Sequence, residues 1–306
     1  MINIVIIHTG FDKYVVHTLK QLRKTNPNSN IFLITDDNYK EYNKYSTFVD
    51  IKSLLKKDSI HFANIYVHFG KSNPKFEMFC MQRWIILRDF MIEYSIDSCI
   101  HIDSDVLVFS DLSKALIPFN NYSISLSNNL ALSMYISNIS ILDEFVNFLL
   151  LKYGDKNQLQ SLSDMFYNTD RCRNGVAGSI SDMDLSREFF STRDNVGNLS
   201  SIINNSTFDS SIVYGDPLFE MIEKNRYKMK KIFFENEVPY CNAFINDRIE
   251  KVRFHSLHLL TWTKVYINRL SKHKNLDFNP YFINIYREFN VLKSKLKKII
   301  LSTNIL

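Results

Sequence analysis

The sequence is poor in glycine, proline and cysteine. It contains 7 Gly, 6 Pro and 4 Cys among 306 residues, and the cysteines are scattered without a C-x-x-C pair. So few glycines and prolines exclude collagen-like and linker-dominated chains, and isolated cysteines favour free thiols in a reducing compartment. Hydrophobic residues make up 45% and charged residues 23%, so the chain has enough apolar material for a sizeable core.

Long apolar runs and a strong charge of one sign are also lacking. No stretch approaches the roughly 18 uninterrupted apolar residues of a membrane span. The first residues lack a basic leader and a cleavage site, so we expect a strand there and no signal peptide. The net charge of +5, from 37 basic and 32 acidic side chains, is too even for a dedicated nucleic-acid binder. These features predict a cytoplasmic globular protein.

Strand and helix patterns alternate from the start of the chain. Residues 2–8 form a β-branched apolar run typical of a strand buried on both faces, and apolar residues at helical spacing follow as far as the turn at 26–28. A second buried strand is expected at 31–34. This order predicts an α/β protein with a mixed, mostly parallel sheet flanked by helices and a right-handed first crossover.

Further elements are expected along the rest of the chain. The patterns predict helices at 76–94 and 139–152, and strands at 99–102, 106–109, 122–126, 132–136, 212–214, 232–234 and 252–254. The stretch 191–211 is rich in Asn and Ser, and we expect a long loop or lid there. Because no linker or repeat divides the chain, we predict one domain over residues 1–270 with a C-terminal appendage over 271–306.

The C-terminal appendage has the pattern of an amphipathic basic helix. Apolar residues recur at spacings of three and four from Phe282 to Ile299, and lysines and one arginine fill the remaining positions. Three interpretations stay open: a helix docked on the domain, a basic helix at 280–306 resting on the anionic inner face of a membrane, or a dimer seam. Docking is the simplest of the three.

The segment CIHIDSDVLVF at 99–109 carries the clearest chemical signal. Asp103 and Asp105 follow a buried strand, at the carboxyl edge where ligands bind in parallel sheets. Two carboxylates at such a place need a neutralising cation, and hard oxygen ligands suit Mg²⁺ or Mn²⁺, which bridges phosphate oxygens. The alternative is a polar turn between two short strands.

These segments together resemble the GT-A glycosyltransferases, over roughly residues 1–270. The resemblance is carried by a buried helix with an arginine (Arg83 or Arg88), a strand, the D-x-D pattern, and LALSMYISN at 130–138 before a helix. It implies a Rossmann-like GT-A fold and a transferase that moves a sugar from a nucleotide-sugar donor, with a UDP-sugar favoured. The acceptor would be a saccharide or lipid-linked saccharide, as in surface-glycan synthesis.

The resemblance also implies roles for individual residues. Asp103 and Asp105 would hold Mn²⁺ or Mg²⁺ against the donor diphosphate, and Ser104 would lie close to the donor. Arg83 would touch the nucleotide, or would equally be a buried partner of a carboxylate. The loop after the first strand, His8, Thr9 and Gly10, would flank the nucleotide, as would Asp36 or Asp37 after the second strand.

A second match lies in FHSLHLLTWTK at 254–264. Glycogenin-like members of the fold carry H-x-x-G-x-x-K, in which the histidine is a metal ligand and the lysine contacts the diphosphate. His258, Thr261 and Lys264 have that spacing, with Thr in place of Gly. The resemblance therefore implies His258 as the third metal ligand, with His255 as the alternative, and Lys264 on the leaving diphosphate. This pattern leans toward retention of configuration.

A third candidate segment begins at Ser181. Asp182 and Asp184 stand in the first turn of a predicted helix, where acidic residues also serve as caps. By the resemblance we favour Asp182 as the catalytic carboxylate. It would be the base in an inverting reaction, or would position a sugar in a retaining one.

Two other functions fit parts of the pattern. A non-catalytic nucleotide-sugar or carbohydrate-binding module could share the fold, although the intact set Asp103, Asp105, His258 and Lys264 argues against loss of activity. A metal-dependent phosphotransferase or nucleotidyltransferase also pairs carboxylates at strand ends, but no glycine-rich phosphate loop is present. We therefore expect a glycosyltransferase that binds a nucleotide sugar and no nucleic acid.

Overall fold

The computed structural model describes residues 2–167, 179–213, 217–224 and 227–274. The chain divides into two compact units that alternate along the sequence. Unit 1 consists of Met1–Phe11, Asn26–Ser104 and Asp111–Ser201, and unit 2 of Asp12–Thr25, Asp105–Ser110 and the chain from Ile202 onward. The amphipathic helix expected at 280–306 lies outside the described residues.

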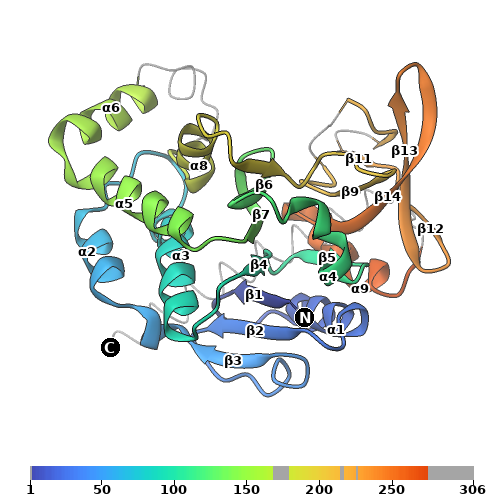
Figure 1. Cartoon of the computed structure of the whole chain (residues 1–306), viewed down its shortest axis with the longest axis horizontal. Helices are drawn as coiled ribbons and strands as arrows, with labels where there is room; N and C mark the ends of the chain where they lie inside the picture. Colours follow the sequence, from blue (N-terminus) through green and yellow to red (C-terminus); the bar gives the residue numbers. More distant parts are fainter. Residues whose placement is uncertain (1, 168–178, 214–216, 225–226, 275–306) are drawn as a thin grey trace, which may run out of the picture. The chain divides into compact units, whose positions relative to one another are not determined.

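Unit 1 is built on a seven-stranded sheet with the order β3-β2-β1-β4-β7-β6-β8 (Figure 1). Strands β1 to β4 run parallel, β7 is antiparallel to both β4 and β6, and β8 is parallel to β6. The strands are β1 Asn3–Ile7, β2 Asn30–Thr35, β3 Thr47–Asp50, β4 Cys99–His101, β6 Ile124–Ser127, β7 Leu130–Ile136 and β8 Val196–Asn198. This mixed, mostly parallel sheet confirms the predicted α/β class.

Most helices of unit 1 contribute apolar side chains to one core that they share with the strands of this sheet. The helices are η1 Ile51–Leu54, α2 Lys57–Ile65, α3 Pro74–Glu93, α4 Leu112–Ala115, η2 Ile117–Phe119, α5 Ser140–Gly154, α6 Lys156–Tyr167 and α8 Asp182–Phe190. The longest, α3, begins where Asn73 accepts hydrogen bonds from the amides of Lys75 and Phe76. Trp84 of α3 packs against Phe145 of α5 in a tilted arrangement, with ring centroids 4.3 Å apart, and both belong to the core of unit 1.

The order in which strands are added to the sheet reverses at β1. From β1 the chain adds β2 and β3 on one side, whereas β4 pairs with the other side of β1. Ligands in open α/β sheets bind outside the carboxyl ends of the strands at such a switch point. His8–Gly10 after β1, Asp36 after β2 and Asp103 after β4 all lie at this edge.

Unit 2 is a mostly antiparallel sheet with the order β12-β13-β14-β5, to which β9 adds in parallel with β14. Its elements are α1 Lys13–Thr25, β5 Val106–Val108, β9 Ser206–Phe208, β10 Met221–Lys224, β11 Tyr227–Lys230, β12 Phe233–Glu235, β13 Val238–Ile245, β14 Arg248–His258, η3 Thr261–Tyr266 and α9 Ile267–Leu270. The short strand β5 comes from the middle of the chain. Helix α1 packs beside it, and Gln21 Nε2 donates to the Val108 carbonyl over 3.2 Å.

Two local predictions are wrong. The polar stretch 191–211 is not one long loop, because β8 pairs with β6 and β9 pairs with β14 through backbone hydrogen bonds that need no apolar side chains. Residues 212 and 213 form no strand. The Ile212 side chain is buried in the core of unit 2, which explains its apolar character without a strand.

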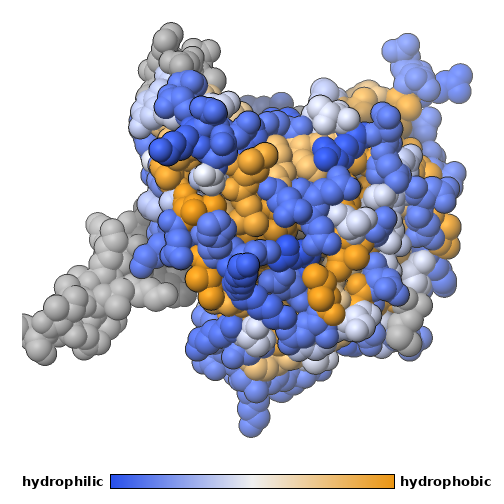
Figure 2. Space-filling model, turned by 60° about the vertical axis from the view of Figure 1, so that its left-hand side comes forward, coloured by the Kyte–Doolittle hydropathy of each residue, from blue (hydrophilic) through white to orange (hydrophobic). Residues whose placement is uncertain are grey.

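Some large apolar side chains reach the surface. Ile60 of α2 is 56% exposed and Leu151 of α5 is 57% exposed. Figure 2 shows that the apolar surface on one face is broken up by polar side chains, as is normal for a water-exposed protein surface. In the part of the chain that the structure describes, no helix has the length and apolar character needed to cross a membrane.

Candidate functional site

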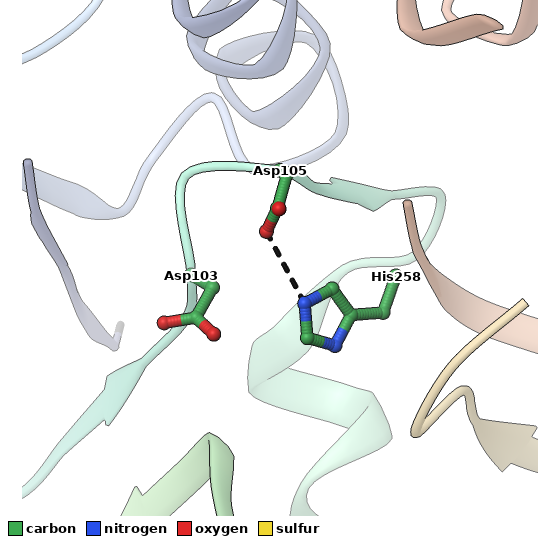
Figure 3. Close-up of side chains that lie close together, drawn as sticks. All are labelled: Asp103, Asp105 and His258. Carbon is green, nitrogen blue, oxygen red and sulfur yellow. Dashed lines mark ion pairs between the residues drawn. The ribbon is translucent and has the colours of Figure 1, made fainter. Parts of the chain in front are cut away.

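The pairing of β5 with β14 brings Asp105 and His258 together. Asp105 directly precedes β5, and the register sets His258 opposite Val106. Asp105 Oδ1 lies 3.2 Å from His258 Nε2, and both side chains are buried (Figure 3). Asp103, drawn in the same figure, precedes Asp105 by two residues. The order strand, D-x-D, strand is therefore as the sequence predicts.

The orientation of the His258 ring is fixed by its other nitrogen. Nδ1 lies 3.0 Å from the carbonyl oxygen of Ser210, and since a carbonyl only accepts, Nδ1 must carry a proton. Nε2 is then the nitrogen that faces the Asp105 carboxylate. Metal-binding histidines are usually held in this way, with one ring N–H donated to a backbone carbonyl and the other nitrogen left for the ion.

Lys264 completes this part of the site. Its Nζ lies 2.9 Å from Asp105 Oδ2 and 5.1 Å from the centre of the Tyr14 ring. Burial alone would raise the pKa of Asp105, but hydrogen bonds and charge from His258 and Lys264 outweigh it and hold the pKa well below its usual range. Burial conversely lowers the pKa of Lys264, and Asp105 and Tyr14 together raise it further than burial lowers it. Both groups are therefore charged at neutral pH.

The residue that replaces glycine in the histidine–lysine motif has an unusual backbone. Thr261, at the start of η3, has φ of +50°, in the left-handed region. A β-branched residue rarely adopts this conformation, which glycine adopts freely. Thr261 therefore holds a backbone conformation that glycine would adopt more readily.

In unit 1, Arg83 of α3 joins the two other candidate carboxylates. Its Nη1 donates to Asp103 Oδ1 over 2.5 Å, and its Nη2 donates to Asp182 Oδ2 over 3.0 Å and to the Ala131 carbonyl over 2.8 Å. The guanidinium therefore holds Asp103, at the end of β4, in a fixed relation to the start of α8. The resemblance implies that Arg83 touches the nucleotide, and a buried carboxylate partner was the alternative; in the structure Arg83 binds Asp103 and Asp182.

Asp182 and Asp184 have different roles at the start of α8. Ser181 is the N-cap, and Asp184 accepts from the Ser181 amide and hydroxyl as a capping box. Asp182 instead points to Arg83 and is buried. Burial raises the pKa of Asp182 to about 6, although the Arg83 cation partly offsets this. The capping interpretation thus fits Asp184, which leaves Asp182 as the candidate for chemistry.

The remaining nucleotide-site candidates lie at the ends of β1 and β2. The Gly10 amide donates to Asp36 Oδ1 over 2.7 Å, so the loop with His8 and Thr9 is tied to the end of β2. Gly10 has φ of +80°, and no atom lies within 4 Å of where a side chain would begin. Ser104 lies in the turn between the two aspartates.

The alternative candidates have other partners. His255 Nδ1 lies 2.9 Å from the Ser110 hydroxyl, and burial beside Arg253 lowers the pKa of His255 to about 4. Arg88 binds Asp58 and Asp89. Between His255 and His258, only His258 faces Asp105 in the described structure.

Sequence patterns missed Asp209 and Lys230, which lie behind His258. Asp209 directly follows β9, and Lys230 is the last residue of β11. Both are buried, and Lys230 Nζ lies 2.6 Å from Asp209 Oδ1. Charged residues are usually exposed, so nothing in the sequence marks this pair.

Comparison with solved structures finds similarity to proteins named as sugar transferases. The chain is similar to mouse xyloside xylosyltransferase 1 in its apo form, with 10% identity over 67% of this chain and 87% of that chain and a TM-score of 0.46. It is similar to the galactosyltransferase LgtC in complex with donor and acceptor sugar analogues, with 12% identity, coverage of 67% and 76% and a TM-score of 0.38. For the glycosyltransferase GlyE of Streptococcus pneumoniae TIGR4 the identity is 15%, the coverage 66% and 46% and the TM-score 0.34. No protein-family model matches the chain, and a search of the curated proteins finds no match.

Proposed function

We propose that this chain is a metal-dependent glycosyltransferase of the GT-A type. It would transfer a sugar from a nucleotide-sugar donor, with a UDP-sugar favoured, to a saccharide or lipid-linked saccharide. The observation that carries the proposal is the His258 imidazole, which is locked through Nδ1 and directs Nε2 at a buried aspartate of the D-x-D segment.

The residues present fit a divalent metal. Asp103, Asp105 and His258 offer two carboxylates and one imidazole, a donor set that suits Mn²⁺ and, less well, Mg²⁺. Only Ser104 separates the two aspartates, so the chain itself keeps their Cα atoms within about 7 Å. The ion, when bound, would neutralise charge on the donor diphosphate.

A lysine and the loops after β1 and β2 would bind the diphosphate and the nucleoside of the donor. The charged ammonium of Lys264 lies beside Asp105. We assign to Lys264 the role of stabilising the negative charge that develops on the departing diphosphate. At the switch point, the loop of His8, Thr9 and Gly10 with Asp36 would hold the nucleoside. The open space at Gly10 would let a ligand approach the backbone closely.

Asp182 would act beside the transferred sugar. A pKa near 6 suits a general base in an inverting reaction, whereas its ion pair with Arg83 suits a fixed hydrogen-bond acceptor in a retaining one. We favour the retaining role, because the ion pair with Arg83 holds the carboxylate in a fixed position. A role in surface-glycan synthesis and cytoplasmic contact with an anionic membrane through residues 280–306 are further hypotheses from the sequence.

A thermal-shift screen tests the proposal. The protein would be heated with UDP, GDP or CDP and their sugars, each with Mn²⁺ and with EDTA. A ligand at about a hundredfold excess over its dissociation constant stabilises the native state by about 2.7 kcal/mol, so a shift in the melting temperature should be readable. We expect one nucleotide to give a shift that EDTA removes.

Matched variants make the screen specific. Asp105→Asn should lose the Mn²⁺-dependent shift, whereas Asp97→Asn, which changes an exposed carboxylate just before β4, should keep it. No shift with any nucleotide, or a shift that ignores both EDTA and Asp105→Asn, would contradict the proposal.

A further inference from the structure

The segment 209–212 binds every polar backbone and ring atom of His258 except Nε2. Asp209 Oδ2 accepts from the His258 amide over 3.0 Å, and the Ser210 carbonyl accepts from Nδ1 over 3.0 Å. The Ile212 amide donates to the His258 carbonyl over 3.0 Å. Three of the four residues in this segment therefore fix the position and orientation of His258.

Lys230 in turn holds this segment at three points. Its Nζ donates to Asp209 Oδ1 over 2.6 Å and to the Ser211 carbonyl over 3.0 Å, and its amide donates to the Ile212 carbonyl over 2.8 Å. The Lys230 ammonium also lies over the rings of Phe219 and Phe254, at 4.9 and 5.6 Å from their centres. Lys230 is 2% exposed and Asp209 is 1% exposed.

Such a pair is not explained by stability. Removing two charges from water is costly, and a buried ion pair often adds no more stability than an apolar pair of the same volume. A buried pair with excellent geometry does fix the position of whatever it is bonded to. The Lys230–Asp209 pair is bonded to the segment 209–212, whose Ser210 carbonyl orients the His258 ring.

We propose that the Lys230–Asp209 pair is a positioning device for His258. It holds the 209–212 segment so that the Ser210 carbonyl keeps the proton on Nδ1 and Nε2 is presented to Asp105. The structural part of this inference stands on the contacts of unit 2 alone. Its consequence for metal affinity rests on the proposed function, in which His258 is a metal ligand.

Two double variants separate positioning from simple folding. Asp209→Asn with Lys230→Met removes both charges together, so no unpaired buried charge remains, but also removes the lysine's hydrogen bonds to Asp209 and Ser211. Asp209→Asn with Lys230→Gln keeps an amide–amide hydrogen bond and a donor for the Ser211 carbonyl. As a matched control, Glu220→Gln with Lys231→Met removes a more exposed ion pair next to β11.

The first readout needs no metal. The imidazole Nδ1–H of His258, held by the Ser210 carbonyl, should give a protected proton NMR signal in the wild type and the control, identified by its loss in His258→Ala. The signal should vanish in the methionine double variant and return in the glutamine one. Persistence of the signal in the methionine variant would overturn the proposal, as would its loss in a folded glutamine variant.

The second readout is Mn²⁺ affinity, measured by isothermal titration. Loss of groups that orient a metal ligand commonly weakens affinity by about 10–100-fold, and we expect a loss in that range for the methionine variant and little change for the control. If the wild type binds no Mn²⁺ while the NMR signals behave as expected, the positioning role stands and the proposed metal-dependent function fails. If Mn²⁺ binds with equal affinity to the wild type and the methionine variant, the positioning proposal fails and the proposed function stands.

Discussion

Two carboxylates of the candidate site are buried, although burial disfavours their charged forms, and each is paired with at least one basic side chain. Asp105 is buried beside His258 and Lys264, and Asp182 is buried beside Arg83. The outcomes differ, because two partners lower the pKa of Asp105 whereas one partner leaves the pKa of Asp182 raised. The two carboxylates should therefore respond differently to pH.

Asp182 should make the native state more stable in acid. Its pKa rises from 3.8 in the unfolded chain to about 6, so between these values the native state binds a proton that the unfolded state releases. This contribution is full below the unfolded pKa and is lost as the pH rises through about 6, and over the whole range it amounts to roughly 3 kcal/mol. Denaturant unfolding between pH 4 and 7 should show this loss in the wild type and not in Asp182→Asn. Parallel pH profiles for the two proteins would contradict it, and Asp97→Asn should follow the wild type.

Thr261→Gly should stabilise the protein. A side chain in the left-handed region costs about 1–2 kcal/mol, and the greater freedom of glycine in the unfolded chain returns roughly 0.5–1 kcal/mol of this. We expect a net gain of roughly 0.5–1 kcal/mol in the free energy of unfolding, measured by urea denaturation. The control is Ser271→Gly, where φ is −65° and the same change should destabilise. A loss of stability in Thr261→Gly would show that contacts of the threonine side chain outweigh its backbone strain.

At the scale of elements, the strands and helices predicted best are those whose own residues form an unambiguous apolar pattern. The continuous β-branched runs of β1 and β2 and the apolar length of α3 indicated their structure directly, and the order strand–helix–strand then indicated the parallel sheet. The position of the D-x-D segment directly after the predicted strand β4 indicated that its aspartates lie at the ligand-binding edge of the sheet. These elements include the switch point, so the general location of the site was predictable.

Elements held by backbone pairing or by distant partners were harder to predict. Strands β8 and β9 lie in a stretch of small polar residues, and only three residues of β14 were predicted although it spans Arg248–His258. The buried Lys230–Asp209 pair has no sequence signal, because its burial depends on β9, β11 and β14 coming together. The contact of Asp105 with His258 likewise required the register of β5 on β14.

The start of α3 offers a test at this scale. The Asn73 side chain accepts from two amides that the helix leaves unpaired, and replacing such an N-cap by alanine costs about 1 kcal/mol. Asn73→Ala should lower the free energy of unfolding by that amount, and Asn73→Asp should not, as measured by chemical denaturation. The control Lys71→Ala, at an exposed position just upstream, should be neutral. Equal stability of Asn73→Ala and the wild type would mean that water caps the helix equally well.

At the scale of the whole molecule, neither unit is a continuous stretch of chain. Unit 2 includes α1 and β5, which come from the first 110 residues of the chain. The prediction of one domain over residues 1–270 did not specify this arrangement. Leu107 of β5, for example, is fully buried among core residues that lie beyond residue 202. No local sequence pattern reports such a pairing.

A fragment test follows from this interleaving. A chain that starts at Ile202 lacks α1 and β5, so β14 has one strand fewer beside it and the core is incomplete. We expect it to show no cooperative thermal transition by circular dichroism, and co-expression with residues 1–201 should restore one. The same complementation with Leu107→Asp in the first fragment should fail. Cooperative folding of the isolated fragment would show that β5 and α1 are dispensable.

The pairing of β5 with β14 also sets an order of events during synthesis. A ribosome adds about 5–20 residues per second, so the roughly 150 residues between Val106 and His258 take about 8–30 s to appear. Throughout that interval the nascent chain carries Asp103 and Asp105 without the histidine, and the edge of β5 has no β14 to cover it. A chain released early, before residue 258, would keep that edge open to strands of its neighbours. A chain that ends before residue 258 should therefore form aggregates that bind no metal.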